Sequence, residues 1–182
     1  MSRQPQPGNL MITSIVLTVI GQDQPGIVEA VSDVLAKHGG NWTQSNMSAL
    51  AGQFAGVLLA TVPDDRVRAC LEGLESLRDR GLTVIARTTS AAPATTATRE
   101  FLLDLVGHDH AGIVRDITQV LSRHGVSVHD LETRVESASM AGGDLFRAEA
   151  RLEVPAGTDI ARLEQDLEAI AAELMVELHL QD

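Results

Sequence analysis

The sequence is short of aromatic side chains and of cations. Aromatic residues make up 2% of the 182 residues, with no Tyr, one Trp and three Phe, so there are few rings on which single-stranded nucleic acid could stack. Lys and Arg number 14 against 25 Asp and Glu, which gives a net charge of −11. This charge repels phosphate backbones and anionic lipid surfaces. We therefore expect no direct contact with nucleic acid or membrane.

Cysteine and long apolar runs are also scarce. Cys70 is the single cysteine, which excludes an internal disulfide and favours a reducing, cytoplasmic location. The apolar stretch from Leu10 to Ile20 is interrupted by Thr13, Ser14 and Thr18. It is too short and too polar to span a membrane, and it predicts a buried strand instead.

What the sequence does contain is an internal repeat. Residues 17–40, LTVIGQDQPGIVEAVSDVLAKHGG, return as residues 103–126, LDLVGHDHAGIVRDITQVLSRHGV. The offset is 86 residues (103 − 17), and ten of the 24 aligned positions are identical. Residues 54–63 then align with 146–155 at an offset of 92, so the second copy holds six extra residues (92 − 86). These fall near 138–143, where small residues predict a hairpin loop.

The first half of each copy reads as a strand followed by a helix. The apolar runs 14–20 and 100–106 predict the strands. Gly39 and Gly125 follow the helices, as expected for a left-handed C-terminal cap. The helical stripes that we expect to face the core are Ile27, Val28, Val31, Val34 and Leu35 in the first copy, and Ile113, Val114, Ile117, Val120 and Leu121 in the second.

The second half of each copy reads as two strands, a helix and a strand. Residues 146–154 alternate apolar and charged side chains, which predicts a strand with one face in the core. Second helices are expected after Pro63 and Pro155, and last strands at 82–86 and 175–180. The order predicts an α+β protein of two ferredoxin-like βαββαβ domains in tandem, each a four-stranded antiparallel sheet with its helices on one face.

The repeat also sets the expected domain limits. Residues 11–88 form the first domain and residues 99–182 the second. Residues 89–98, rich in Thr, Ala and Ser, read as a linker, and residues 1–10 as a disordered tail.

The turn between first strand and first helix is the most informative motif. It reads GQDQPGIV from Gly21 and GHDHAGIV from Gly107. A helix that begins near Pro25 and Gly26 presents unpaired N–H groups and a positive dipole end, which suit a carboxylate. Asp23 is placed to cap the helix or to pair with an ammonium group. A purely structural role, with the Asp as cap and the Pro-Gly pair reversing the chain, stays open.

These turns, the helix ends KHGG and RHGV, and the segment from Leu131 to Pro155 resemble the ACT domain family over residues 11–180. ACT domains commonly bind amino acids at domain interfaces. The pattern is most similar to a subgroup of tandem ACT proteins that repress transcription. The resemblance implies an amino-acid-sensing regulator without a catalytic domain. It further implies action through a protein partner such as a transcription activator, because no DNA-binding helix is left over. Four-stranded sheets leave free edges that favour pairing, so we expect the two copies to pack side by side in one chain and the chain to form a homodimer.

The resemblance implies ligand contacts at the turn and at the start of the second strand. In the first copy these are Asp23, Gln24, Pro25, Gly26, Ile27 and Asn41; in the second they are Asp109, His110, Gly112, Ile113 and Ser127. Ala111 replaces the proline, and Ser127 stands where the first copy has Asn41. The first copy is therefore the better candidate for binding, and no cofactor or metal is expected.

Other readings compete with this one. Tandem ACT modules also precede catalytic domains in phosphoserine phosphatases, although the two copies use nearly all of the 182 residues. The chain could equally be a regulatory subunit of a metabolic enzyme. A metal site at His108 and His110 is disfavoured because Gln22 and Gln24, poor metal ligands, replace them in the first copy. Cys70 lacks a neighbouring base and is expected to be buried.

Overall fold

A computed structural model describes residues 11–89, 97–137 and 143–181. The chain divides into two compact units, residues 1–93 and 94–182. The predicted tail at 1–10 lies outside the described residues. So do residues 90–96 of the predicted linker and 138–142 of the predicted hairpin loop.

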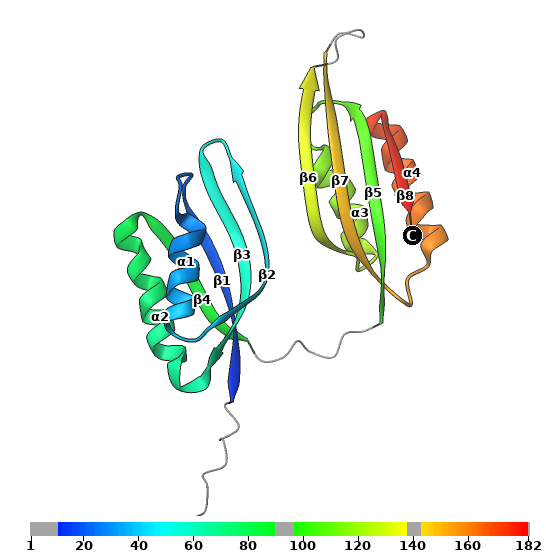
Figure 1. Cartoon of the computed structure of the whole chain (residues 1–182). Helices are drawn as coiled ribbons and strands as arrows, with labels where there is room; N and C mark the ends of the chain where they lie inside the picture. The colour runs from blue at the N-terminus through cyan, green and yellow to red at the C-terminus, as the bar shows by residue number, and fades with distance from the viewer. Residues whose placement is uncertain (1–10, 90–96, 138–142, 182) are drawn as a thin grey trace, which may run out of the picture. The chain divides into compact units, whose positions relative to one another are not determined.

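The first unit contains four strands and two longer helices in the predicted order. They are β1 (Ile12–Gln22), α1 (Ile27–Lys37), β2 (Asn41–Leu50), β3 (Gln53–Pro63), α2 (Val67–Glu75) and β4 (Leu82–Thr89). The strands pair antiparallel in the order β2-β3-β1-β4. Both helices cover one face of this sheet (Figure 1).

The second unit repeats this arrangement. Its elements are β5 (Thr98–His108), α3 (Ile113–Arg123), β6 (Ser127–Ser137), β7 (Asp144–Pro155), α4 (Ile160–Leu174) and β8 (Val176–Gln181). The sheet order is β6-β7-β5-β8, again antiparallel, with both helices on one face (Figure 1). The predicted tandem of ferredoxin-like units is confirmed. Along the described chain no helix has the length and apolar character needed to cross a membrane.

The first strands are longer than the apolar runs predicted. β1 pairs with β3 from Ile12 with Pro63 to Gln22 with Gln53, because the long strand β3 extends the ladder beyond the buried residues. The left-handed helix ends are as predicted, with φ of 70° at both Gly39 and Gly125.

Each unit has its own hydrophobic core between sheet and helices. Most residues of the predicted helical stripes do face the core, and the exceptions lie at the edges of the buried helix faces. Val28 and Val114 are 47% and 40% exposed, whereas Ala30 is buried. The buried face of α1 therefore includes the small Ala30, which lets the helix and the sheet approach closely, and Val28 lies at the edge of that face. Cys70 is fully buried, and this burial raises the pKa of its thiol, as expected for an inert core cysteine.

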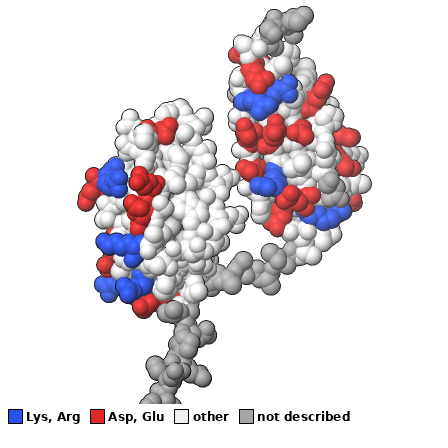
Figure 2. Space-filling view, viewed as in Figure 1, with Lys and Arg blue, Asp and Glu red and all other residues white. Residues whose placement is uncertain are grey.

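The two sheets differ in charge. Residues 41–63, which form β2 and β3, contain no Asp, Glu, Lys or Arg, and the surface over these strands is white in Figure 2. On β6 and β7 charged residues alternate, and arginines pair with carboxylates across the strands. The distances are 3.5 Å for Arg134–Glu149, 3.3 Å for Arg147–Glu136 and 3.1 Å for Arg151–Asp130. Figure 2 shows red and blue groups over this sheet.

The helices of the second unit are linked by an ion pair. His124, after the last turn of α3, lies with Nε2 2.9 Å from Oδ2 of Asp166 on α4. Arg162 lies 3.3 Å from the other oxygen of the same carboxylate. The hydrogen bond with His124 and the nearby positive charges lower the pKa of Asp166.

This ion pair predicts a pH dependence. The pKa of Asp166 is lowered on folding, so its ionised form stabilises the second unit above the ordinary Asp pKa of about 3.9. That contribution is lost as pH falls through the lowered value. We expect Asp166→Asn to be less stable than the parent at pH 7, with the difference shrinking progressively below about pH 4. Urea unfolding at a series of pH values, followed by circular dichroism, measures it. Glu164→Gln, an exposed change on the same helix, is the control. A difference that stays constant across the series would contradict the assignment.

Candidate ligand-binding site

The first turn leads into a helix start that has no side-chain cap. Gly26, with φ of 93°, is the N-cap of α1, and the helix begins at Ile27. The first intrahelical hydrogen bond runs from the N–H of Ala30 to the carbonyl of Gly26, at 2.9 Å. The N–H groups of Ile27, Val28 and Glu29 therefore have no partner within the helix, the arrangement that attracts anions.

Asp23 does not cap this helix, so that part of the sequence prediction is wrong. No side chain accepts a hydrogen bond at the N-cap of α1. Asp23 stands three residues before the N-cap, and its backbone N–H donates to the carbonyl of Gly52 at 2.9 Å. Pro25 also precedes the N-cap rather than occupying the first helical turn. The side chains of Asp23 and Gln24 are exposed, and the backbone bond fixes the turn to the β2–β3 hairpin.

The second turn has the same backbone design. Gly112, with φ of 106°, is the N-cap of α3, and no side chain caps the helix. The N–H of Asp109 donates to the carbonyl of Asp144 at 2.9 Å. The ring of His110 lies against two carbonyls, with Nδ1 3.3 Å from the oxygen of Ala111 and Nε2 3.3 Å from that of Leu174. The His110 side chain thus links the turn to the end of α4.

The charged groups around the two helix starts differ. A β-carbon built on Gly26 would lie 3.7 Å from Oε2 of Glu29, so a carboxylate already stands beside the first helix start. A β-carbon on Gly112 would lie 3.4 Å from Nη2 of Arg115 and 3.4 Å from Oδ2 of Asp116. Among the described residues, the first helix start therefore has an unpaired carboxylate beside it, and the second has a guanidinium and a carboxylate together.

Arg115 and Asp116 form an ion pair of 2.7 Å. Their hydrogen bond raises the pKa of Arg115 and lowers that of Asp116, so both groups are charged at neutral pH. One guanidinium and one carboxylate beside a helix start match the carboxylate and ammonium of an α-amino acid. The sequence prediction did not include these two residues. The sequence did contain a signal for them, because the two copies of the repeat differ at both positions: the first copy has Glu29 and Ala30 there.

Asn41 and Ser127 lie far from the turn of their own unit. Asn41 pairs with Thr61, which pairs with Ser14, seven residues from Gly21 on β1. At about 3.3 Å per residue the separation is roughly 23 Å. In the second unit Ser127 pairs with Glu153, which pairs with Glu100, seven residues from Gly107 on β5. Within one unit the structure therefore does not bring the start of β2 or β6 beside the turn.

Among the described residues no group of three or more His, Cys, Asp or Glu side chains could hold a metal ion.

The fold and the turns define a tandem of small α+β modules, each with an uncapped helix start after its first strand. The family model of the ACT domain matches residues 13–85 and 99–181. The chain therefore belongs to the ACT domain family, and it contains two copies of the domain.

Known proteins of similar length share this organisation. The glycine cleavage system transcriptional repressor of Escherichia coli is 22% identical over 162 residues, which cover 88% of this chain and 85% of that protein. The predicted resemblance to transcriptional repressors built of tandem ACT domains is thereby confirmed. A crystal structure of a protein of unknown function from Galdieria sulphuraria is 30% identical and superposes with a TM-score of 0.84, covering 94% of this chain and 98% of that one. A solved structure described as a glycine cleavage system transcriptional repressor has a TM-score of 0.66 at 19% identity, covers 94% of this chain and 97% of that one, and shows the common fold.

Proposed function

We propose that this protein is an amino-acid-sensing regulator without a catalytic domain, which controls transcription through a protein partner. The observation that carries the proposal is the pair of helix starts at Gly26 and Gly112, each of which begins at an αL glycine and has no side-chain cap. The similarity to a transcriptional repressor over 88% of the chain supports the regulatory role.

In this proposal the ligand carboxylate binds the backbone N–H groups at the helix start. In the first unit Ile27 provides such a group, Gly26 allows close approach, and Asp23 pairs with the ammonium. Gln24 and Pro25 form the exposed rim of the turn.

In the second unit Ile113 and Gly112 take the corresponding roles, and Asp109 faces the ammonium. Arg115 adds a cation that the first unit lacks, since Glu29 stands at its position. His110 keeps the turn against α4. The second helix start, where Arg115 offsets the charge of Asp116, is therefore less repulsive to an anionic head group than the first, where Glu29 stands alone. This is the reverse of the preference that the sequence suggested.

Asn41 and Ser127 enter the proposed site from a second copy of the chain. Each lies about 23 Å along the sheet from the turn of its own unit, too far for one small ligand to span. They begin the edge strands β2 and β6, whose free backbone groups favour pairing with another strand. We therefore propose a homodimer in which these residues complete sites on the partner chain.

The proposed effector of transcription is a protein partner such as an activator, in the cytoplasm. A net charge of −11 disfavours direct binding to DNA or to a membrane. The open face of the first sheet carries half-exposed Ile20, Val57 and Ile85, and such an apolar surface fits a protein contact. The alternative is a regulatory subunit or part of an enzyme of amino-acid metabolism. Recovery of only a metabolic enzyme in a pull-down from native cells would favour that alternative.

Calorimetric titration with a panel of amino acids tests the proposed site. At least one amino acid is expected to bind more tightly than 1 mM. Arg115→Glu is expected to weaken binding at the second unit by about tenfold or more, since hydrogen bonds to charged groups contribute roughly 1.5–3 kcal/mol. Arg123→Glu makes the same charge change at the far end of α3 and serves as the control. If no amino acid binds, the sensing function is wrong. If an amino acid binds and both variants bind it as the parent does, Arg115 does not belong to the site.

A further inference from the structure

The sheet of the first unit has an open face, on the side away from its helices, that carries large aliphatic side chains. Leu17, Leu58 and Val84 lie in the core between the sheet and the helices, so the alternate residues of β1, β3 and β4 point the other way. Three of these outward side chains are about half exposed. The aliphatic strip of the open face consists of Val16, Ile20, Val57, Leu59 and Ile85.

The strands of this sheet are almost without charge. β1 to β4 contain one Asp, Glu, Lys or Arg, which is Arg87 near the end of the edge strand β4. β5 to β8, of the same total length, contain 13. An antiparallel sheet face that stays in water is expected to be polar, as the second one is. The first sheet lacks that character on its open face.

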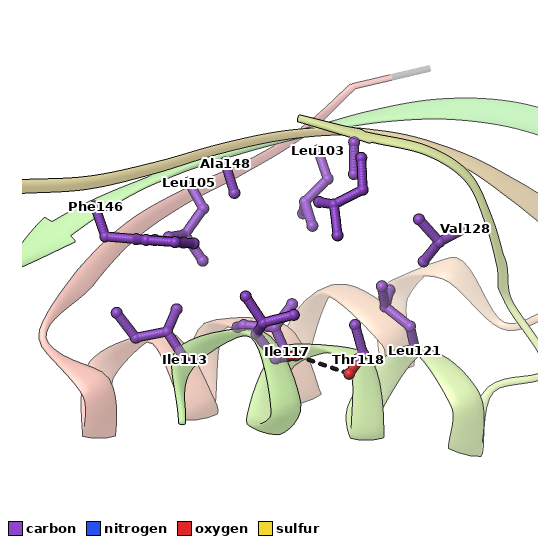
Figure 3. Close-up of a pocket in the computed structure, with 12 residues that line it drawn as sticks. Leu103, Leu105, Ile113, Ile117, Thr118, Leu121, Val128, Phe146 and Ala148 are labelled. Atoms are coloured by element: carbon purple, nitrogen blue, oxygen red, sulfur yellow. Dashed lines mark hydrogen bonds between the residues drawn. The ribbon is translucent and has the colours of Figure 1, made fainter. Parts of the chain in front are cut away.

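The second unit uses the apolar side chains of its sheet inside the unit. Figure 3 shows Leu103 and Leu105 of β5 pointing toward Ile117 of α3, and a cavity of about 30 Å³ remains there beside Ala150. Three ion pairs join β6 and β7 on the other face of the same sheet. The two units therefore offer different surfaces to other proteins, although their folds are the same.

Uncharged polar side chains border the aliphatic strip. In the β2–β3 ladder Gln44 and Asn46 pair directly with members of the strip, so their side chains lie on the open face. An apolar centre with a polar rim is the common anatomy of a protein interface. An amide side chain both donates and accepts hydrogen bonds, so this rim can pair with an identical rim.

The distribution of charge favours a second copy of this face as the occupant. Residues 1–93 hold seven Lys and Arg against eight Asp and Glu, a net charge of −1, whereas residues 94–182 hold seven against 17, a net charge of −10. Two first units can therefore approach without the repulsion that separates two second units. Contact of the open face with the second sheet of another copy would remove water from ion pairs and supply no new partner. A twofold contact between identical open faces joins neutral surface to neutral surface.

The size of the open face suits a reversible dimer. The seven residues of β1 from Ser14 to Ile20 span about 23 Å, and four strands about 4.8 Å apart span roughly 19 Å. The flat area is then roughly 440 Å² on each copy, and the relief of the side chains adds to it. Stable specific interfaces bury about 800 Å² on each partner, and weak ones less than about 600 Å². We therefore expect an association that reverses on dilution.

We propose that the open face of the first sheet packs against the same face of a second copy, so that two first units stack their sheets about 10 Å apart. The protein contact that this apolar surface fits is then another copy of the chain. The contact needs no amino acid, and it is separate from the free edges of β2 and β6. A chain that uses both contacts forms assemblies larger than dimers.

Analytical ultracentrifugation of the full chain over a dilution series tests this contact. The parent is expected to associate, and Val57→Asp to weaken the association by about a hundredfold or more, because like charges then meet across the interface. Ile85→Glu acts in the same way from β4 and keeps the test valid if circular dichroism shows that Val57→Asp does not fold. Raised salt is expected not to weaken the association, since no ion pair holds it.

Leu102→Asp is the matched control. Leu102 is 51% exposed on the open face of the second sheet, against 50% for Val57, and its replacement is expected to leave the association unchanged. An equal loss of association in Leu102→Asp and in Val57→Asp would contradict the assignment to the first sheet.

Methyl NMR spectra at several concentrations identify the surface that associates. The signals of Val57 and Ile85 are expected to shift with concentration. Shifts confined to Val128 and Val135, on the edge strand β6, would assign the association to that edge and overturn the inference. A parent that stays monomeric, with its open face left for another protein, also overturns it, as does association that both charged variants of the face retain. The sensing function is tested separately, by the amino-acid titrations.

Discussion

Leu58→Ala is expected to lower the free energy of unfolding of the first unit by about 2–5 kcal/mol. Leu58 is fully buried on β3 and belongs to the core cluster that holds the buried residues of both helices. Truncation removes three carbons and leaves a cavity that the surrounding strands cannot fill. A domain of about 80 residues has roughly 4–12 kcal/mol of stability in all, so this change removes a large part of it.

Urea unfolding followed by Trp42 fluorescence measures the effect, because Trp42 is the single tryptophan and lies on β2 beside β3. The matched control is Val57→Ala, the adjacent residue on the open face of the same strand, which is 50% exposed. Its expected loss is below about 1 kcal/mol. Equal losses in the two variants would show that the helical face of β3 does not form the core.

Gly107→Ala is expected to destabilise the second unit by about 3 kcal/mol, the range of overpacking in a closed site. Gly107 pairs with Phe146 on one side and with Val176 on the other. An added β-carbon would lie 2.8 Å from Cβ of Val176 and 2.9 Å from its Cα. These atoms cannot rotate away, so the strands β5 and β8 must separate.

Urea unfolding followed by circular dichroism at a β-sheet wavelength detects this loss. Gly157→Ala provides the comparison, since a β-carbon there meets nothing within 4 Å, and its effect is expected to stay within about 0.5 kcal/mol. If Gly107→Ala proves as stable as Gly157→Ala, the close approach of β8 to β5 at this level is wrong.

Much of the fold could be predicted from the sequence because the same pattern of strands, helices and turns occurs in it twice. Each copy of the repeat places apolar residues with period two in the strands and glycine at the helix ends, and these local patterns fix the order of elements. Element limits were less accurate. β1 runs from Ile12 to Gln22 because β3 pairs with its whole length, and pairing is a property of the partner strand.

The candidate site was predicted less well than the fold. The sequence located the turns at Gly26 and Gly112, since a glycine at a strand-to-helix junction is a local signal. Of the two roles that it offered for Asp23, the helix cap is wrong, because the position of the cap depends on where the chain leaves the turn, and the pairing with an ammonium group stays a prediction. Whether the turn residues bind an amino acid remains a prediction for the titrations above.

By itself, the sequence determined that the protein is two copies of one α+β module, because hydrophobic period and turn glycines are local properties repeated at 86 residues. The tertiary structure alone decided which side chains share a surface. It placed Arg115 beside Gly112 and separated Asn41 from the turn by roughly the length of a strand. It also opened a cavity beside Ala150, because packing space depends on strands that are distant in the chain, and residue order does not encode that distance.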